Sequence, residues 1–195
     1  MGFLFPIEVH EKDIPVIPGL SYHPEYVTAA EETLLTTAID QGVWDSTWER
    51  RRQLFGGTYG NKKEQVQAIP DWGQQLAERM LREGLTARPF DHMLVNEYIP
   101  GQGIAMHLDY DPYDRTVVSV SLLAPYVMDF KHLESGEQCS LLLEPRSLLV
   151  LSDDARYQWQ HGIARRKNDR WHGVMIPRAR RLSITFRALK QTTES

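Results

Sequence analysis

The segment Ala105–Asp111 (AMHLDYD) places a histidine and two carboxylates at alternate positions of the chain. In a β-strand, residues i, i+2 and i+4 point to one face, so His107, Asp109 and Asp111 would share a face if the segment is extended. Polar groups that converge on a buried face are costly to desolvate unless something occupies the space between them. Imidazole and carboxylate groups are metal ligands, so the spacing predicts a metal site.

A third ligand is offered by His161, which ends the run Arg156–His161. Gly162 follows it, and a residue without a side chain allows close approach of backbone or ligand. Two histidines and one carboxylate form the facial triad of non-haem Fe(II) oxygenases, which leaves open coordination positions. Taken alone, His161 is interpreted equally well as a histidine that only packs in the core. The spacing itself has little specificity, because His132-Leu133-Glu134 repeats it without a third partner.

The segment Arg181–Arg187 (RLSITFR) alternates without error, which predicts a strand with Leu182, Ile184 and Phe186 on its apolar face. The polar face begins and ends with an arginine, and six residues of strand separate the two by about 20 Å. Arginine binds carboxylate or phosphate through two parallel hydrogen bonds, so a short dicarboxylate could lie between them. An edge strand with its polar face in water is the alternative.

Size and composition favour one globular domain spanning 1–195, because 195 residues with 42% hydrophobic content can form a sizeable core. No apolar run approaches the roughly 20 residues that cross a membrane, and the first residues are too short and acidic for a secretory signal. The single cysteine, Cys139, excludes an internal disulfide and a Cys-cluster metal site. We therefore expect a cytoplasmic protein without a membrane or obligate protein partner, and a monomer.

The net charge of −4 conceals an asymmetry along the chain. Between His161 and Lys190 there are nine Lys or Arg residues and one acid, Asp169. A local basic stripe on an acidic protein predicts an anionic partner, and Arg165 and Arg166, which closely follow His161, are expected at the mouth of the site. A solvated basic loop is the alternative.

The elements that must position these residues fall into two parts. Helices are predicted over Val27–Ile39 and Trp72–Arg82, the second with Asp71 as N-cap and an end at Gly84, and a loop or hairpin over Gly42–Gly60. From Phe90 onward short β-rich runs recur, which is typical of a sandwich or barrel, and eight strands often form a jelly roll. The predicted strands are His92–Tyr98, Ile104–Asp109, Thr116–Leu123, Tyr126–His132, Ser140–Leu143, Ser147–Ser152, Tyr157–Ile163 and Arg181–Leu189.

Five segments together resemble the AlkB family of Fe(II)- and 2-oxoglutarate-dependent dioxygenases, in order and spacing from about Leu94 to Leu189. These segments are Asn96–Gly101, His107–Asp111, Ser119–Leu122, Arg156…Ile163 and Arg181–Arg187. The N-terminal part matches only loosely, through Arg51-Arg52-x-x-Phe55-Gly56-x-x-Tyr59. The resemblance implies an α+β, mainly β fold: a double-stranded β-helix (jelly-roll) core over 90–190, with a helical buttress and a nucleotide-recognition lid within 1–89.

The resemblance also implies three sets of ligand contacts. Fe(II) would be held by His107, Asp109 and His161. The metal-chelating end of 2-oxoglutarate would contact Asn96 and Arg187, and its distal carboxylate would contact Tyr98, Arg181 and Ser183. The founding bacterial member has an asparagine where this chain has Ser183, whose hydroxyl can still donate a hydrogen bond.

For the substrate, the resemblance implies that Asp111 reads the exocyclic amine of a target base. Pro112 stands where the founding member has a second acid, which leaves the base preference open. The remaining expected substrate contacts are Trp48, Arg51, Arg52, Tyr59, Arg156, Arg165 and Arg166. For any one lid residue, Trp44 and Phe55 included, packing of the loop on the core is an equally good interpretation.

The implied activity is oxidative dealkylation of N-alkylated nucleobases, such as 1-methyladenine, 3-methylcytosine and etheno adducts, in DNA or RNA. It would use Fe(II), O₂ and 2-oxoglutarate and release succinate, CO₂ and an aldehyde. One alternative is the same chemistry on a modified tRNA base or a protein side chain. Another is a cupin-like binding module without catalysis, because one fold serves many functions.

Overall fold

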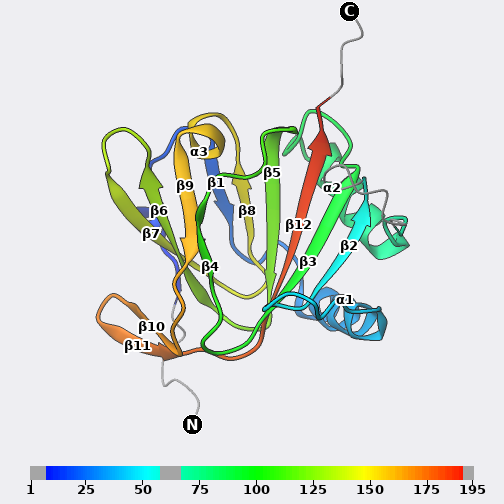
Figure 1. Ribbon diagram of the computed structural model, residues 1–195, viewed down its shortest axis with the longest axis horizontal. Coiled ribbons are helices and arrows are strands. Elements are labelled where there is room, and N and C mark those ends of the chain that lie inside the picture. Colours follow the sequence, from blue (N-terminus) through cyan, green and yellow to red (C-terminus); the bar gives the residue numbers. More distant parts are fainter. Residues whose placement is uncertain (1–7, 58–66, 191–195) are drawn as a thin grey trace, which may run out of the picture.

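The computed structural model describes residues 8–57 and 67–190, and in it two antiparallel sheets face each other (Figure 1). The major sheet has the strand order β1-β8-β5-β12-β3-β2, and the minor sheet has the order β4-β9-β6-β7. The strands are β1 Leu20–His23, β2 Arg52–Gly56, β3 His92–Tyr98, β4 Ile104–His107, β5 Tyr113–Leu122, β6 Tyr126–His132, β7 Gln138–Leu143, β8 Leu148–Leu151, β9 Trp159–Ile163, β10 Asn168–Trp171, β11 Val174–Pro177 and β12 Arg181–Leu189. The predicted jelly-roll core is confirmed.

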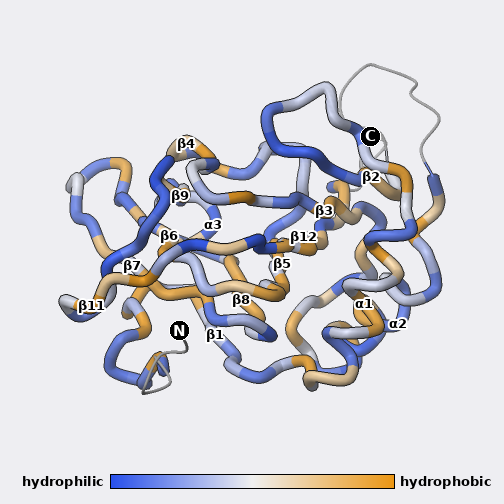
Figure 2. Tube along the Cα trace, turned by 90° about the horizontal axis from the view of Figure 1, so that it is seen from below, coloured by the Kyte–Doolittle hydropathy of each residue, from blue (hydrophilic) through white to orange (hydrophobic). Residues whose placement is uncertain are grey.

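The helices are α1 Ala29–Gln41, α2 Asp71–Arg82 and α3 Asp153–Tyr157, with a 3-10 turn, η1, at Glu11–Asp13. Helices α1 and α2 lie beside the outer face of the major sheet (Figure 2). Ile39 and Met80 are fully buried in the core cluster that also contains Ile184 of β12. Within the described residues, no helix is long and apolar enough to cross a membrane.

Strand β12 places polar side chains in the interior of the protein. Its apolar residues Leu182, Ile184 and Phe186 pack in the cluster beneath the helices. Its alternate residues therefore face the minor sheet, and they are buried as well: Arg181, Ser183, Thr185 and Arg187 are each at most 9% exposed. The predicted alternation is confirmed, and the edge-strand alternative is wrong because β12 lies between β5 and β3.

Several predicted boundaries are confirmed and others are wrong for local reasons. Strands β3, β6 and β12 have the predicted bounds, and Gly84 follows α2 with φ +75°, a conformation that favours glycine. Asp71 is not the N-cap of α2: Pro70 occupies that position. The strand predicted from Tyr157 begins at Trp159, because Asp153–Tyr157 forms α3.

Three strand regions lie outside the strand prediction. Strand β1 pairs with β8, and β2 extends the major sheet beyond β3 from within the expected loop or hairpin over 42–60. Strands β10 and β11 form a separate hairpin within the basic stripe. These strands are short, four or five residues each, and polar in part, so their periodicity is weak.

Candidate active site

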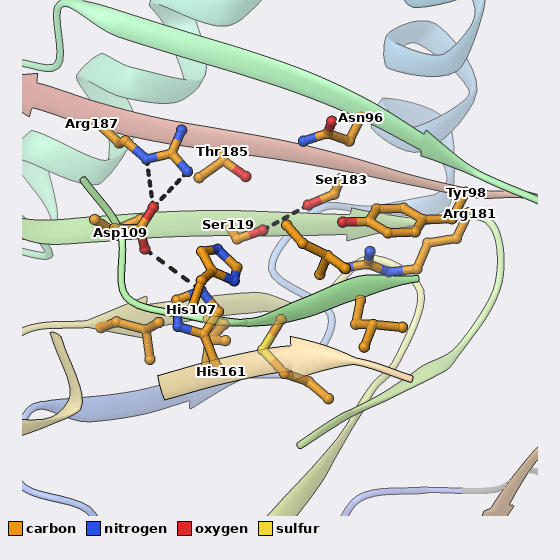
Figure 3. Close-up of a pocket in the computed structure, with 16 residues that line it drawn as sticks. Asn96, Tyr98, His107, Asp109, Ser119, His161, Arg181, Ser183, Thr185 and Arg187 are labelled. Carbon is orange, nitrogen blue, oxygen red and sulfur yellow. Dashed lines mark hydrogen bonds and ion pairs between the residues drawn. The ribbon is translucent and has the colours of Figure 1, made fainter. Parts of the chain in front are cut away.

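His107 and His161 are brought together by the pairing of two short strands. Strand β4 runs antiparallel to β9 with His107 opposite His161, and the two imidazole centroids are 4.5 Å apart (Figure 3). Asp109 follows β4, and its Oδ2 lies 3.6 Å from Nε2 of His161. Gly162 permits the close approach of β4 and β9, because a Cβ there would lie 2.8 Å from Sδ of Met106.

The protonation states suit a divalent cation. His107 Nδ1 lies 2.9 Å from the Ala105 carbonyl, which must accept its proton, so Nε2 is left as the ligand atom. Burial lowers the pKa of His161 to about 4, which keeps that imidazole neutral at pH 7. Burial opposes ionisation of Asp109, but the charge and hydrogen bonds of Arg187, together with the nearby His161 and His107, outweigh it and hold the Asp109 pKa well below its usual range. Neutral imidazoles and an ionised carboxylate are the forms that bind metal.

The three groups do not form a finished coordination sphere. Within the described residues, no group of three His, Cys, Asp or Glu side chains has the geometry of a metal site as it stands. Asp109 Oδ1 accepts hydrogen bonds from Nη2 and Nε of Arg187, at 2.6 and 2.9 Å. The donor chemistry and convergence of His107, Asp109 and His161 fit Fe(II). In this structure the Asp109 carboxylate is hydrogen-bonded to Arg187.

Arg181 brings a buried positive charge to the pocket beside these residues. The side chain is 1% exposed and stacks on Tyr98 and Tyr126, with ring centroids 5.2 and 5.8 Å away. Its Nη2 donates to Ser121 Oγ at 2.8 Å, whereas Nε and Nη1 have no partner among the described residues. Burial lowers the pKa of Arg181, but a guanidinium remains charged in proteins. A buried cation with two free donors calls for a carboxylate.

The opposite end of this pocket is polar as well. Arg187 has a buried Nη1 without a partner in the described part of the chain. Between the two arginines, Ser183 and Ser119 share a hydrogen bond of 2.9 Å, and Asn96 lies across the β3–β12 register from Ser183 (Figure 3). The structure therefore brings the expected 2-oxoglutarate residues into one pocket with the three expected metal ligands.

A second cavity, of about 370 Å³, adjoins the first. The two share Asn96, Ile104, His107, Asp109 and Arg187, so two of the three metal-ligand candidates, His107 and Asp109, lie between them. Its further lining residues are Trp48, Arg50, Arg52, Leu54, Leu94, Leu108, Tyr110 and Tyr113. The volume is within the range of small-molecule sites. Arg50 is a site residue that sequence reasoning missed, because its neighbours Arg51 and Arg52 carried the family motif.

Two expected lid residues, Trp48 and Arg52, line this second cavity. The Arg52 guanidinium lies 4.4 Å from the Trp48 ring centroid, and its Nε binds Asp45 at 3.0 Å. Trp48 is 60% exposed, so its ring is available to a ligand. Tyr59 lies outside the described residues.

Five expected substrate residues do not line either cavity: Arg51, Asp111, Arg156, Arg165 and Arg166. Arg51 stacks on Trp44 and binds Glu97. The Asp111 side chain is 85% exposed and pairs with Lys190 at 3.1 Å.

Arg156 is 2% exposed and donates to the carbonyls of Asp109 and Tyr110, at 3.0 and 2.9 Å. Because it is enclosed, Arg156 positions the loop after the metal ligands and does not present its charge to a substrate.

Most of the basic stripe is neutralised within the fold. Arg165 pairs with Glu49, while Arg166 and Arg178 both bind Asp169, whose side chain is fully buried. Lys167 and Arg170 have no ion pair among the described residues, so the exposed excess of positive charge is smaller than the sequence suggests.

Comparison with known proteins identifies the family. The model of the 2OG-Fe(II) oxygenase superfamily matches residues 20–187. The probable RNA/DNA demethylase ALKBH6 of Danio rerio is 30% identical, over 87% of this chain and 85% of the relative. The chain belongs to the AlkB family of 2-oxoglutarate- and Fe(II)-dependent oxygenases. The uncharacterized protein L905 of Acanthamoeba polyphaga mimivirus is 35% identical, over 87% of this chain and 84% of that one.

Other relatives in the AlkB family are longer. The tRNA (carboxymethyluridine(34)-5-O)-methyltransferase ALKBH8 of Macaca fascicularis is 32% identical over 90% of this chain, which spans only 31% of that protein. Among solved structures, OsALKBH1 shares the fold with a TM-score of 0.68 and 16% identity, over 89% of this chain and 99% of its own.

Membership of the AlkB family makes the chain a dioxygenase that uses Fe(II), 2-oxoglutarate and O₂. The family resemblance seen in the sequence is confirmed, and the alternative of a binding module without catalysis is not supported.

Proposed function

We propose that this AlkB-family dioxygenase removes alkyl groups from nucleobases of DNA or RNA by oxidation. The observation that carries the proposal is the second cavity, which is of base size and opens onto His107 and Asp109 beside the anion pocket. For each methyl group, one O₂ and one 2-oxoglutarate would be consumed and succinate, CO₂ and formaldehyde released. The demethylase name of the Danio rerio relative supports the same class of reaction.

The chain's own residues would divide the work between binding and orientation. His107, Asp109 and His161 would hold Fe(II), which supplies the redox chemistry for oxidising a C–H bond when bound. Arg181 would bind the distal carboxylate of 2-oxoglutarate, with Tyr98 and Ser183 beside it. Arg187 and Asn96 would bind the end nearer the metal ligands. Arg156 would fix the backbone that carries Asp109, through its two carbonyl contacts.

The base would enter from the side of the lid. A base that is stacked in a duplex cannot reach this cavity, so the substrate must be single-stranded or have the base flipped out. The exposed ring of Trp48, backed by Arg52, offers a stacking surface for the base. Lys167 and Arg170 are exposed and have no ion pair among the described residues, so their charges are free to meet phosphates.

A modified tRNA base is a second candidate substrate with the same chemistry. The relative from Macaca fascicularis is named for an activity on a tRNA uridine, and this chain matches part of it. The same cavity would receive the base of either substrate. The two candidates therefore differ in the nucleic acid that carries the base.

Mass spectrometry of short oligonucleotides tests the proposal directly. DNA and RNA forms carrying 1-methyladenine, 3-methylcytosine, 1-methylguanine, 3-methyluracil or an etheno base would be incubated with Fe(II), 2-oxoglutarate and O₂. We expect loss of the alkyl mass with the wild-type protein and none with Asp109→Ala. Slow succinate formation with no change in any oligonucleotide would refute the nucleobase substrate while leaving the oxygenase intact.

A further inference from the structure

Arg50 brings an unbalanced positive charge to the wall of the second cavity. Its Nη1 donates to the Gly103 carbonyl, and its guanidinium lies 5.3 Å from the ring centroid of Tyr98. Its Nε is buried without a hydrogen-bond partner among the described residues. The one hydrogen bond reaches a neutral carbonyl, and no ion pair of Arg50 exists in the described part of the chain. Its charge is therefore available to whatever enters the cavity.

Among the described residues that line the cavity, no carboxylate is free to offset this charge. Asp109 is the one acid among the described residues that line the cavity, and it is bound by Arg187 and expected on the metal. Arg52 is balanced by Asp45, which leaves Arg50 as the excess. Asp111, the acid expected to read the base, is exposed and paired with Lys190.

The bound cofactors would not reverse the sign of the net charge around the cavity. The two carboxylates of 2-oxoglutarate and that of Asp109 would together face the divalent metal, Arg181 and Arg187. Their positive charge, +4, still exceeds the negative charge, −3, before Arg50 is counted. A base that carries its own positive charge would thus enter a cavity of like charge, with no free acid among the described lining residues to receive it.

Alkylated bases differ in their charge at neutral pH. Methylation of adenine at N1 or cytosine at N3 gives a cation at neutral pH, whereas methylation of guanine at N1 or uracil at N3 leaves a neutral base with carbonyl acceptors. We propose that this enzyme selects neutral, carbonyl-bearing bases over cationic ones, an inference that rests on the proposed function. Arg50 is the residue that sets the preference: it repels a cationic base and can donate to a carbonyl oxygen.

A matched pair of substrates isolates the charge. 3-Methyluracil and 3-methylcytosine have nearly the same shape and differ in charge, and they would be placed at the same position of one RNA oligonucleotide. The ratio of their kcat/KM values does not depend on the fraction of active enzyme, so a poorly folded variant still gives a valid ratio. For the wild-type protein we expect roughly tenfold or more in favour of 3-methyluracil, the effect of one nearby like charge in a partly screened site.

Three variants separate charge from shape. Arg50→Gln should reduce the preference roughly tenfold, because it removes the cation and keeps a donor. Arg50→Lys should retain most of the preference, since the charge stays while the planar guanidinium is lost. Arg82→Gln, at the exposed end of α2, controls for overall charge and should leave the ratio unchanged.

The outcomes distinguish this inference from the proposed function. Demethylation of both bases with a preference for 3-methylcytosine, or a ratio that Arg50→Gln does not move, overturns the role of Arg50 and keeps the nucleobase activity. An equal loss of preference in Arg50→Lys and Arg50→Gln overturns the charge argument. Demethylation of neither base, with other alkylated oligonucleotides also unchanged, overturns the proposed function and this inference with it.

Discussion

Replacement of Arg181 by methionine should make the ligand-free protein more stable and yet abolish tight binding of 2-oxoglutarate. Arg181 is 1% exposed and is surrounded by Tyr98, Tyr126 and Ser121. Two of its nitrogens, Nε and Nη1, have no partner among the described residues. Methionine has a similar length and flexibility, and it has no charge to desolvate.

The stability change follows from opposing contributions. A buried ion costs several kcal/mol in real proteins. Contacts with the two aromatic faces offset about 1–2 kcal/mol each, and the hydrogen bond to Ser121 offsets about 1 kcal/mol. We therefore expect Arg181→Met to stabilise the ligand-free protein by about 1–2 kcal/mol. For a chain of this length, that raises Tm by about 3–6 °C.

The binding change has the opposite sign. Two charge-assisted hydrogen bonds to a carboxylate contribute about 3–6 kcal/mol, so their loss should weaken 2-oxoglutarate roughly 10²–10⁴-fold. Thermal unfolding with and without 2-oxoglutarate, together with calorimetric titration, measures both quantities. The ligand should raise the Tm of the wild type and leave that of Arg181→Met unchanged. A variant that binds 2-oxoglutarate as the wild type does would refute the assignment of this pocket.

Three further predictions concern residues around the site. Arg156→Met removes the side-chain hydrogen bonds to the Asp109 and Tyr110 carbonyls, so Mn²⁺ affinity measured by titration should fall about 10–100-fold, with partial recovery in Arg156→Lys. Asp169→Asn leaves the buried Arg178 guanidinium without a counter-charge, which should cost about 3–5 kcal/mol and lower Tm by roughly 10 °C, whereas an unchanged Tm would contradict the ion-pair argument. Burial lowers the pKa of His92 to about 3, so as the pH falls the unfolded chain takes up a proton at this residue before the folded protein does. Between about pH 6.5 and 3, His92 should therefore lower the free energy of unfolding of the wild type by up to about 1.4 kcal/mol per pH unit. His92→Phe should show a shallower decrease, measured by urea unfolding at each pH.

The sequence predicted the jelly-roll core well because its strands alternate clearly. Leu182, Ile184 and Phe186 determine which face of β12 packs against the helices, and the arginines on the other face follow from the period of two. The pattern could not show that this polar face is also buried. That depends on the minor sheet, which covers it through strands paired at long range.

The lid was less predictable, because the sequence does not show which acid each of its arginines pairs with. Arg51, Arg52 and Arg165 look alike in the sequence, but they pair with Glu97, Asp45 and Glu49. The basic stripe gave the same difficulty, since its charge is balanced by acids from other segments. Only distances in the folded chain distinguish an arginine that is already paired from one that is free to meet a ligand.

Arg50 and Arg181 illustrate the same physical principle at two neighbouring sites. Both stack on Tyr98, at 5.3 and 5.2 Å from its ring centroid, and both keep buried nitrogens without partners among the described residues. Such groups lower the stability of the empty protein, which natural proteins tolerate at functional sites. Arg181 faces a pocket suited to a dicarboxylate, where an anion satisfies it fully. Arg50 faces the larger cavity, where a neutral carbonyl would satisfy it and a cation would not, so the same unmet charge that binds the cosubstrate would also select the base.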